Sequence, residues 1–154
     1  MVTSYVALTD GSRTIHFIGD NMQPDQPPTM NGKKILCIED EHFISELYAR
    51  ALTRAGYEVD VELDGQKGLA AALTDKYDII LLDLMIPTMT GVEVLQNIRA
   101  TADDKKIRAK IIITTNLEQR DDVKANIERQ ADGYLVKAEI TPRELVEFIS
   151  HIEA

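Results

Sequence analysis

The sequence of 154 residues predicts one α/β domain in which five parallel strands alternate with five helices in a doubly wound sheet. Two observations carry this prediction. Short runs of β-branched and other apolar residues, bounded by polar groups, recur along the chain and are typical of strands in a parallel sheet. Between these runs, apolar residues recur at the spacing of amphipathic helices. Because crossovers between parallel strands are right-handed, we expect helices on both faces of the sheet.

Five segments have the length and composition of strands. Four are apolar runs that stop at a polar group, as expected for strands buried on both faces. The fifth, Tyr57–Leu63, alternates apolar and polar residues and is typical of a half-buried edge strand. We expect the other four strands within Lys33–Glu41 and at Tyr77–Asp83, Ile111–Thr115 and Gly133–Lys137.

Five further segments show helical spacing. The first begins after Asp40 and stops at Gly56, a residue that commonly follows a helix C-terminus. The last begins with Thr141 as its N-cap, followed by proline at the first helical position and glutamate at the third. We expect the three intervening helices at Asp64–Lys76, Gly91–Ala100 and Glu118–Gln130.

Residues 1–32 differ from the rest and are expected to form an N-terminal tail or linker before a domain at residues 33–154. Three of the five prolines lie here beside polar residues, and such sequence cannot bury enough apolar area to fold alone. A short hairpin at residues 4–19 is the alternative, because Asp10 and Gly11 separate two apolar runs. An isolated hairpin is marginal in water, so we favour a mobile tail.

The net charge of −9 argues against two classes of partner. Nucleic acids and anionic membranes are both bound mainly through Lys and Arg. No apolar stretch approaches the ~20 residues that span a membrane, and no secretory signal opens the sequence, so we expect a cytoplasmic protein. The single cysteine, Cys37, lies within the first apolar run, where a buried structural thiol is favoured over a redox sensor.

Polar side chains stand at the ends of four expected strands: Glu39 and Asp40, then Asp83, Thr115 and Lys137. The carboxyl ends of parallel strands meet at one edge of a sheet, and ligands bind in the crevice beyond them. Carboxylates at adjacent strand ends repel each other, and a hard cation such as Mg²⁺ relieves that repulsion. A hydroxyl donor and an ammonium group beside them suit a charged phosphoryl oxygen. Together the strand ends predict a magnesium and phosphoryl site.

Most of these residues also have a simpler interpretation. Adjacent acids at Glu39–Glu41 are usual at a solvated helix start, where they favour the helix dipole. Thr115 can be an ordinary β-branched strand residue, and Lys137 a surface charge with a buried stem. Asp83 is harder to explain in this way, because a carboxylate that ends a buried strand is unfavourable unless it is paired or metal-bound. The joint occurrence of these residues in sequence order favours the phosphoryl site.

Residues 33–154 resemble the receiver domain of two-component response regulators, the chemotaxis-regulator-like family. The acidic motif CIEDE resembles the end of that family's first strand. The segment LLDLMIPTMTG resembles the one that carries its phospho-accepting aspartate, with Pro87 four and Gly91 eight residues after Asp83. The step of 22 residues from Thr115 to Lys137 also fits. The resemblance implies a flavodoxin-like sandwich with the parallel strand order 2-1-3-4-5.

The resemblance also implies roles for the residues at the strand ends. Asp83 would accept the phosphoryl group, and Lys137 would pair with that group or, without it, with Asp83. Mg²⁺ would be bound by Asp40, Asp83 and the backbone carbonyl of Met85. Glu39 would hold a metal-bound water.

Two further residues would form a switch in this family. Thr115 would supply the switch hydroxyl, and its movement toward the phosphoryl group would let Tyr134 turn inward. The face made by the fourth helix, the fifth strand and the fifth helix would then change shape. The fourth helix has only Val123 and Ile127 as strong apolar anchors, which suits an element that must shift.

The sequence departs from the family pattern near the site. Ala138 stands where proline is usual, and a cis bond before a residue other than proline costs ~3 kcal/mol, so we expect a trans Lys137–Ala138 bond and a somewhat displaced Lys137. Asn116 replaces a small residue and would narrow the entrance or donate a hydrogen bond. Met85 and Leu117 are apolar at positions that often influence phosphoryl lifetime, which predicts slow self-dephosphorylation.

We therefore expect a stand-alone, phosphorylation-activated signalling receiver that catalyses only its own phosphorylation and dephosphorylation. A sensor histidine kinase or phosphotransfer protein would supply the phosphoryl group, and an unidentified protein would respond. We expect a monomer before phosphorylation and leave dimerisation on activation open.

The first alternative is a phosphorylation-independent protein-binding module, which Ala138 and Asn116 favour. An aspartate-based phosphatase is disfavoured because Met85 stands where that chemistry usually needs a second acid. A flavin or nucleotide binder is disfavoured because the turn after the first strand is acidic rather than glycine-rich.

Overall fold

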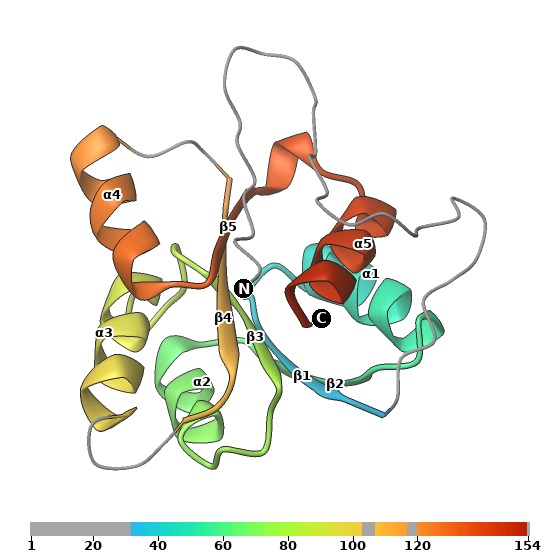
Figure 1. The fold of residues 1–154 in the computed structure, drawn as a ribbon, viewed down its shortest axis with the longest axis horizontal. Helices are drawn as coiled ribbons and strands as arrows, with labels where there is room; N and C mark the ends of the chain where they lie inside the picture. The colour runs from blue at the N-terminus through green and yellow to red at the C-terminus, as the bar shows by residue number, and fades with distance from the viewer. Residues whose placement is uncertain (1–31, 103–106, 117–119, 154) are drawn as a thin grey trace.

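The computed structural model describes residues 32–102, 107–116 and 120–153. The five strands of this part form one parallel sheet in the order β2-β1-β3-β4-β5, which confirms the predicted doubly wound fold (Figure 1). The strands are β1 (Lys34–Ile38), β2 (Glu58–Glu62), β3 (Ile79–Asp83), β4 (Lys110–Thr115) and β5 (Gly133–Val136).

The helices alternate with the strands and cover both faces of the sheet. They are α1 (His42–Arg54), α2 (Gly65–Ala72), α3 (Gly91–Ala102), α4 (Asp121–Gln130) and α5 (Pro142–Glu153), with a short 3₁₀ turn, η1 (Lys137–Glu139), before α5. Figure 1 shows α1 and α5 on one side of the sheet and α2, α3 and α4 on the other.

Alternate residues of each central strand point into two separate cores, as the pleat requires. In β1, Ile35 and Cys37 join the core under α1 and α5, whereas Leu36 and Ile38 join the core under α2, α3 and α4. All of β3 is buried, including its last residue, Asp83. The apolar runs in the sequence arise because both faces of these strands are covered.

The ends of three helices can be compared with the ends predicted from the sequence. The predicted cap of α5 is confirmed, since the Glu144 N–H donates to Thr141 Oγ1 at 3.2 Å. α2 is shorter than expected and ends at Ala72, because Asp75 adopts a left-handed φ of 55° and its N–H bonds Ala72 O three residues back. α4 begins at Asp121, later than expected, because Arg120 has an extended ψ of 151° and is the N-cap rather than a helical residue; Glu118, the expected start, lies outside the described residues.

The expected tail and the alternative hairpin also fall on residues that the structure does not describe, apart from Gly32. None of the helices in the described ranges has both the length and the apolar character needed to cross a membrane.

Candidate phosphoryl and magnesium site

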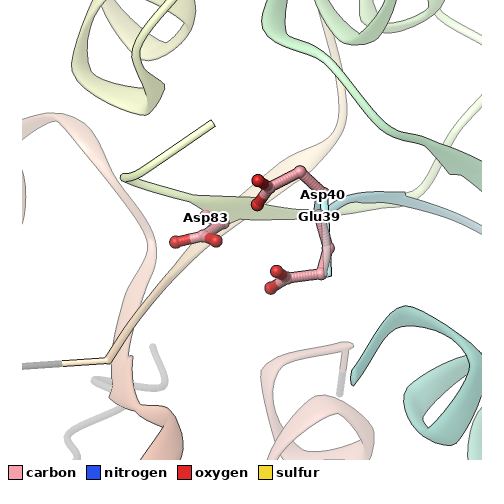
Figure 2. A group of neighbouring side chains, drawn as sticks. All are labelled: Glu39, Asp40 and Asp83. Carbon is pink, nitrogen blue, oxygen red and sulfur yellow. The ribbon is translucent and has the colours of Figure 1, made fainter. Parts of the chain in front are cut away.

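The three acids predicted at the ends of two strands come together. β1 lies beside β3 with Ile38 opposite Leu82, so Glu39, Asp40 and Asp83 emerge at the same edge of the sheet. One carboxylate oxygen of each lies within 4.8 Å of the others. Figure 2 shows the three side chains pointing to the same side, beyond the strand ends. Tertiary structure thus assembles the predicted acidic cluster.

Lys137 reaches the same cluster from the end of β5. Its side chain is only 3% exposed, and its Nζ lies 2.9 Å from Asp83 Oδ2 and 2.5 Å from Glu39 Oε2. The pairing with Asp83 agrees with the expectation from the family pattern. The pairing with Glu39 was not expected, because the two residues are separated by 98 positions and no local signal connects them.

Burial and neighbouring charges set the protonation of this cluster. Burial raises the pKa of Glu39 to about 7; the hydrogen bond from Lys137 opposes this increase, and the Asp83 charge adds to it. For Lys137, burial would lower the pKa, but the hydrogen bonds to Glu39 and Asp83 outweigh it and raise the pKa. Lys137 therefore carries its positive charge at neutral pH.

The donor set fits a hard divalent cation. Three carboxylates converge on one lysine, so the fully ionised cluster carries an excess of two negative charges. Asp40 is exposed while Glu39 and Asp83 are buried, so the cluster opens to solvent on one side. Oxygen ligands at a partly open site suit Mg²⁺, which keeps several of its waters.

Each oxygen of Asp83 has its own partner. Oδ2 receives the Lys137 ammonium, and Oδ1 accepts a hydrogen bond of 3.1 Å from the Met85 N–H. The second bond is local and closes the turn that follows β3. It links the direction of the carboxylate to the backbone at Met85, the residue whose carbonyl is the expected third ligand.

The two expected switch residues lie on adjacent strands. Thr115 ends β4 and is buried opposite Val136 of β5, and Tyr134 lies two residues earlier in β5 opposite Ile113. Tyr134 is 6% exposed, with Lys124 Nζ of α4 5.5 Å from its ring centroid. Tyr134 is therefore buried between β4 and α4, and its turning on phosphorylation stays a prediction.

Comparison with known families decides what this arrangement represents. The sequence profile described as the response regulator receiver domain matches residues 35–150, which is more than half of the chain. The chain belongs to the response regulator receiver family. Domains of this family are signalling modules of two-component systems rather than typical enzymes, and the predicted family resemblance is confirmed.

Curated relatives extend beyond this receiver domain. The chain is 38% identical over 121 residues to the response regulator ArlR of Staphylococcus saprophyticus, and equally identical to ArlR of Staphylococcus aureus. The matched part is 79% of this chain and 51% of each relative. The chain therefore spans about half the length of these relatives.

Solved structures agree with the receiver fold. The chemotaxis protein CheY4 of Vibrio cholerae superposes with a TM-score of 0.69 at 29% identity, covering 79% of this chain and 99% of that one. The response regulator TrrA of Thermotoga maritima, solved in complex with Mg²⁺ and BeF, superposes with a TM-score of 0.65 at 32% identity, covering 78% and 98%. The flavodoxin-like sandwich predicted from the sequence is thus confirmed.

The departures of this receiver domain from its family pattern have visible consequences. The described residues contain no cis peptide bond, so the Lys137–Ala138 bond is trans as expected. Lys137 nevertheless reaches both carboxylates, so the displacement we expected does not separate it from Asp83. Asn116 Nδ2 lies 3.5 Å from Glu41 Oε1, which makes it the hydrogen-bond donor anticipated from the sequence.

Two other residues singled out in the sequence complete this description. Cys37 is buried, and burial, reinforced by the Glu39 charge, raises the pKa of its thiol to about 12, which supports the structural interpretation of this cysteine. Leu117 lies outside the described residues.

Proposed function

We propose that this receiver domain is switched by phosphorylation of Asp83. The observation that carries the proposal is the buried Asp83 carboxylate, which lies 2.9 Å from the Lys137 ammonium and within a cluster of three acids. A buried acid is otherwise unfavourable, and this surrounding set of charges matches the needs of phosphoryl transfer.

An oxygen of Asp83 would attack the phosphorus of a phosphohistidine, and the bond from phosphorus to the imidazole nitrogen would break as the new P–O bond forms. The donor would be a sensor histidine kinase or a phosphotransfer protein. Lys137 lies at hydrogen-bond distance from Asp83 Oδ2. Its ammonium group would stabilise the negative charge that develops on the phosphoryl oxygens during transfer.

Mg²⁺, held by Asp40, Asp83 and the Met85 carbonyl, would supply the remaining positive charge that the phosphoryl oxygens require. Glu39 would orient a metal-bound water. Its ion pair with Lys137 also holds the ammonium group of that lysine between Glu39 and Asp83. The lysine is thereby preorganised, which is the main source of catalysis in such sites.

The phosphorylated Asp83 would then act on the switch residues. Its new oxygens can accept a hydrogen bond from the Thr115 hydroxyl at the end of β4. Movement of Thr115 would change the packing beside Tyr134. The ring of Tyr134 contacts α4 through the ammonium group of Lys124. The face of α4, β5 and α5 would thereby respond to the phosphoryl group and control an as yet unidentified protein partner.

The test is intact mass after incubation with acetyl phosphate and magnesium, with Asp83→Ala and a chelator as controls. Addition of one phosphoryl group to the wild-type protein alone is the expected result. Absence of addition with every donor would refute the proposal.

That negative result would favour the second candidate, a receiver that binds its partner without phosphorylation. The observation in its favour is Asn116, which stands where a small residue is usual and reaches toward Glu41. Replacing it in the Asn116→Ala variant would then distinguish a blocked entrance from an inert site, because only a blocked entrance would regain phosphorylation.

A further inference from the structure

The loop between β3 and α3, residues 84–90, is fastened to the beginning of α2. Thr88 Oγ1 accepts a hydrogen bond of 3.1 Å from the Gln66 N–H and donates one of 3.2 Å to Asp64 Oδ1. The Gly65 N–H donates to Pro87 O at 2.9 Å. Three hydrogen bonds therefore join segments that are 22 to 24 residues apart in the sequence.

The backbone at Thr88 indicates that these bonds hold the loop in a conformation it would not otherwise prefer. Thr88 has a φ of 69°, in the left-handed region. A β-branched residue rarely adopts this region, and such strain persists only where surrounding contacts enforce it. The two hydrogen bonds of the Thr88 hydroxyl and the adjacent bond from the Gly65 N–H to Pro87 O are such contacts.

The α2 side of this contact is itself held by hydrogen bonds. Asp64 is the N-cap of α2, and its Oδ1 also accepts a bond of 2.8 Å from the Lys67 N–H. That bond and the Thr88 hydroxyl hold the pKa of Asp64 below its usual range, so Asp64 is an ionised acceptor. At Gly65, a Cβ atom would lie 2.0 Å from Met89 O, so the loop approaches α2 as closely as the backbone allows.

The other end of the loop leads directly to the phosphoryl site. The Met85 N–H donates to Asp83 Oδ1, and the Gly91 N–H donates to Leu84 O at 3.0 Å. A Cβ at Gly91 would lie 2.2 Å from Asp83 O, so the loop closes tightly on the end of β3. A shift at Thr88 would therefore be transmitted to Met85 and to the carboxylate of Asp83.

We propose that Thr88 and Asp64 are positioning residues of this receiver domain, which hold the loop after β3 so that Met85 and Asp83 are aligned for Mg²⁺. The inference rests on the proposed function, because it assigns these residues to the same magnesium and phosphoryl site. The alternative is that the hydrogen bonds of Thr88 and Asp64 only stabilise α2 and do not influence Mg²⁺ binding.

Two pairs of variants separate these interpretations. Thr88→Val removes the hydroxyl, keeps the shape, and leaves the Asp64 cap on Lys67 intact, whereas Thr88→Ser keeps the hydroxyl. Asp64→Ala removes the acceptor, whereas Asp64→Asn keeps an acceptor oxygen. If Asp64→Ala fails to fold because α2 loses its cap, the Thr88 pair decides the question alone.

Asp75→Ala is the matched control. Asp75 also has a positive φ, of 55°, and its carboxylate also accepts a backbone N–H, from Arg108 at 2.9 Å. It precedes β3, so it lies at the opposite end of that strand from Asp83. The Asp75→Ala substitution should lower the stability of the fold without changing the affinity for Mg²⁺.

The measurement is a calorimetric Mg²⁺ titration of each variant, followed by the rate of phosphorylation by acetyl phosphate as a function of Mg²⁺. We expect Thr88→Val and Asp64→Ala to raise the Kd for Mg²⁺ about tenfold, with the rate at saturating Mg²⁺ changed by less than about twofold. Thr88→Ser, Asp64→Asn and Asp75→Ala should bind Mg²⁺ like the wild type.

Unchanged Mg²⁺ affinity in Thr88→Val would overturn the inference, as would an equal loss in Asp75→Ala or a wild-type protein that binds no Mg²⁺. A wild-type protein that binds Mg²⁺ but takes no phosphoryl group would refute the proposed function instead. The positioning role would still be decided by the measured affinities.

Discussion

Lys137 Nζ lies 2.9 Å from Asp83 Oδ2, and both side chains are almost completely buried. This pair connects the ends of β3 and β5, two strands that β4 separates in the sheet. Because Glu39 shares the same ammonium group at 2.5 Å, one lysine compensates two buried carboxylates. Glu39 and Asp83 therefore share the positive charge of Lys137 at this edge of the sheet.

Replacement of that cation should destabilise the fold. In Lys137→Met, Glu39 and Asp83 lose their shared partner, and we expect the free energy of unfolding in a chelator to fall by about 3 kcal/mol. Urea denaturation measures this change. Lys34→Met is the control, because its ion pair with Glu58 is exposed and should contribute less than about 1 kcal/mol. Similar losses in both variants would contradict the dependence on Lys137.

Added Mg²⁺ should stabilise the protein, because the acidic cluster is assembled only in the folded chain. At a Mg²⁺ concentration of about 100 times Kd, the gain in unfolding free energy should be about 2.7 kcal/mol. Thermal unfolding with and without a chelator measures it.

Asp83→Asn should abolish most of this gain by removing one ligand. Asp78→Asn is its control, since Asp78 accepts the Lys34 N–H where β1 begins, away from the cluster. A gain that is equal in Asp83→Asn and the wild type would place the ion elsewhere.

Phosphorylated Asp83 should be long-lived because Met85 offers no polar group that orients water. Met85 is 72% exposed, so a polar replacement there can reach solvent beside Asp83. We expect Met85→Asn to shorten the half-life of the phosphorylated protein about threefold or more. The loss of phosphoryl mass after removal of the donor gives this half-life.

Phe43→Asn provides the comparison, since Phe43 is a similarly exposed apolar residue, 74% exposed, in α1. A half-life that is the same in Met85→Asn and the wild type would show that Met85 does not limit hydrolysis.

Alkaline pH should destabilise the fold through Cys37. Burial raises the pKa of its thiol from the ordinary value of 9.0 to about 12 in the folded protein, so the unfolded chain loses this proton first. The free energy of unfolding should therefore decrease from about pH 9 upward, by about 1 kcal/mol at pH 10 relative to a variant without the thiol. Cys37→Ala is that variant. The smaller side chain lowers its unfolding free energy by the same amount at every pH, so this loss does not change the shape of its pH profile. Parallel pH profiles of the two proteins would contradict the assignment.

The elements that could be predicted from sequence are those with a local cause. The buried strands are continuous apolar runs because both faces of the sheet are covered, and the Thr141 cap lies three residues from Glu144. The early end of α2 was missed, because the left-handed backbone at Asp75 is held by Arg108, 33 residues away. The predicted influence of Leu117 on phosphoryl lifetime stays a prediction, because this residue lies outside the described part of the chain.

The candidate site divides in the same way. The sequence alone determined which residues stand at the carboxyl ends of the strands, because strand length and polarity are local properties. Only the tertiary structure decided that Lys137 also contacts Glu39, and that Thr88 contacts Asp64. Those contacts depend on the packing of strands and loops distant in sequence, where the geometry of the folded sheet selects the partners.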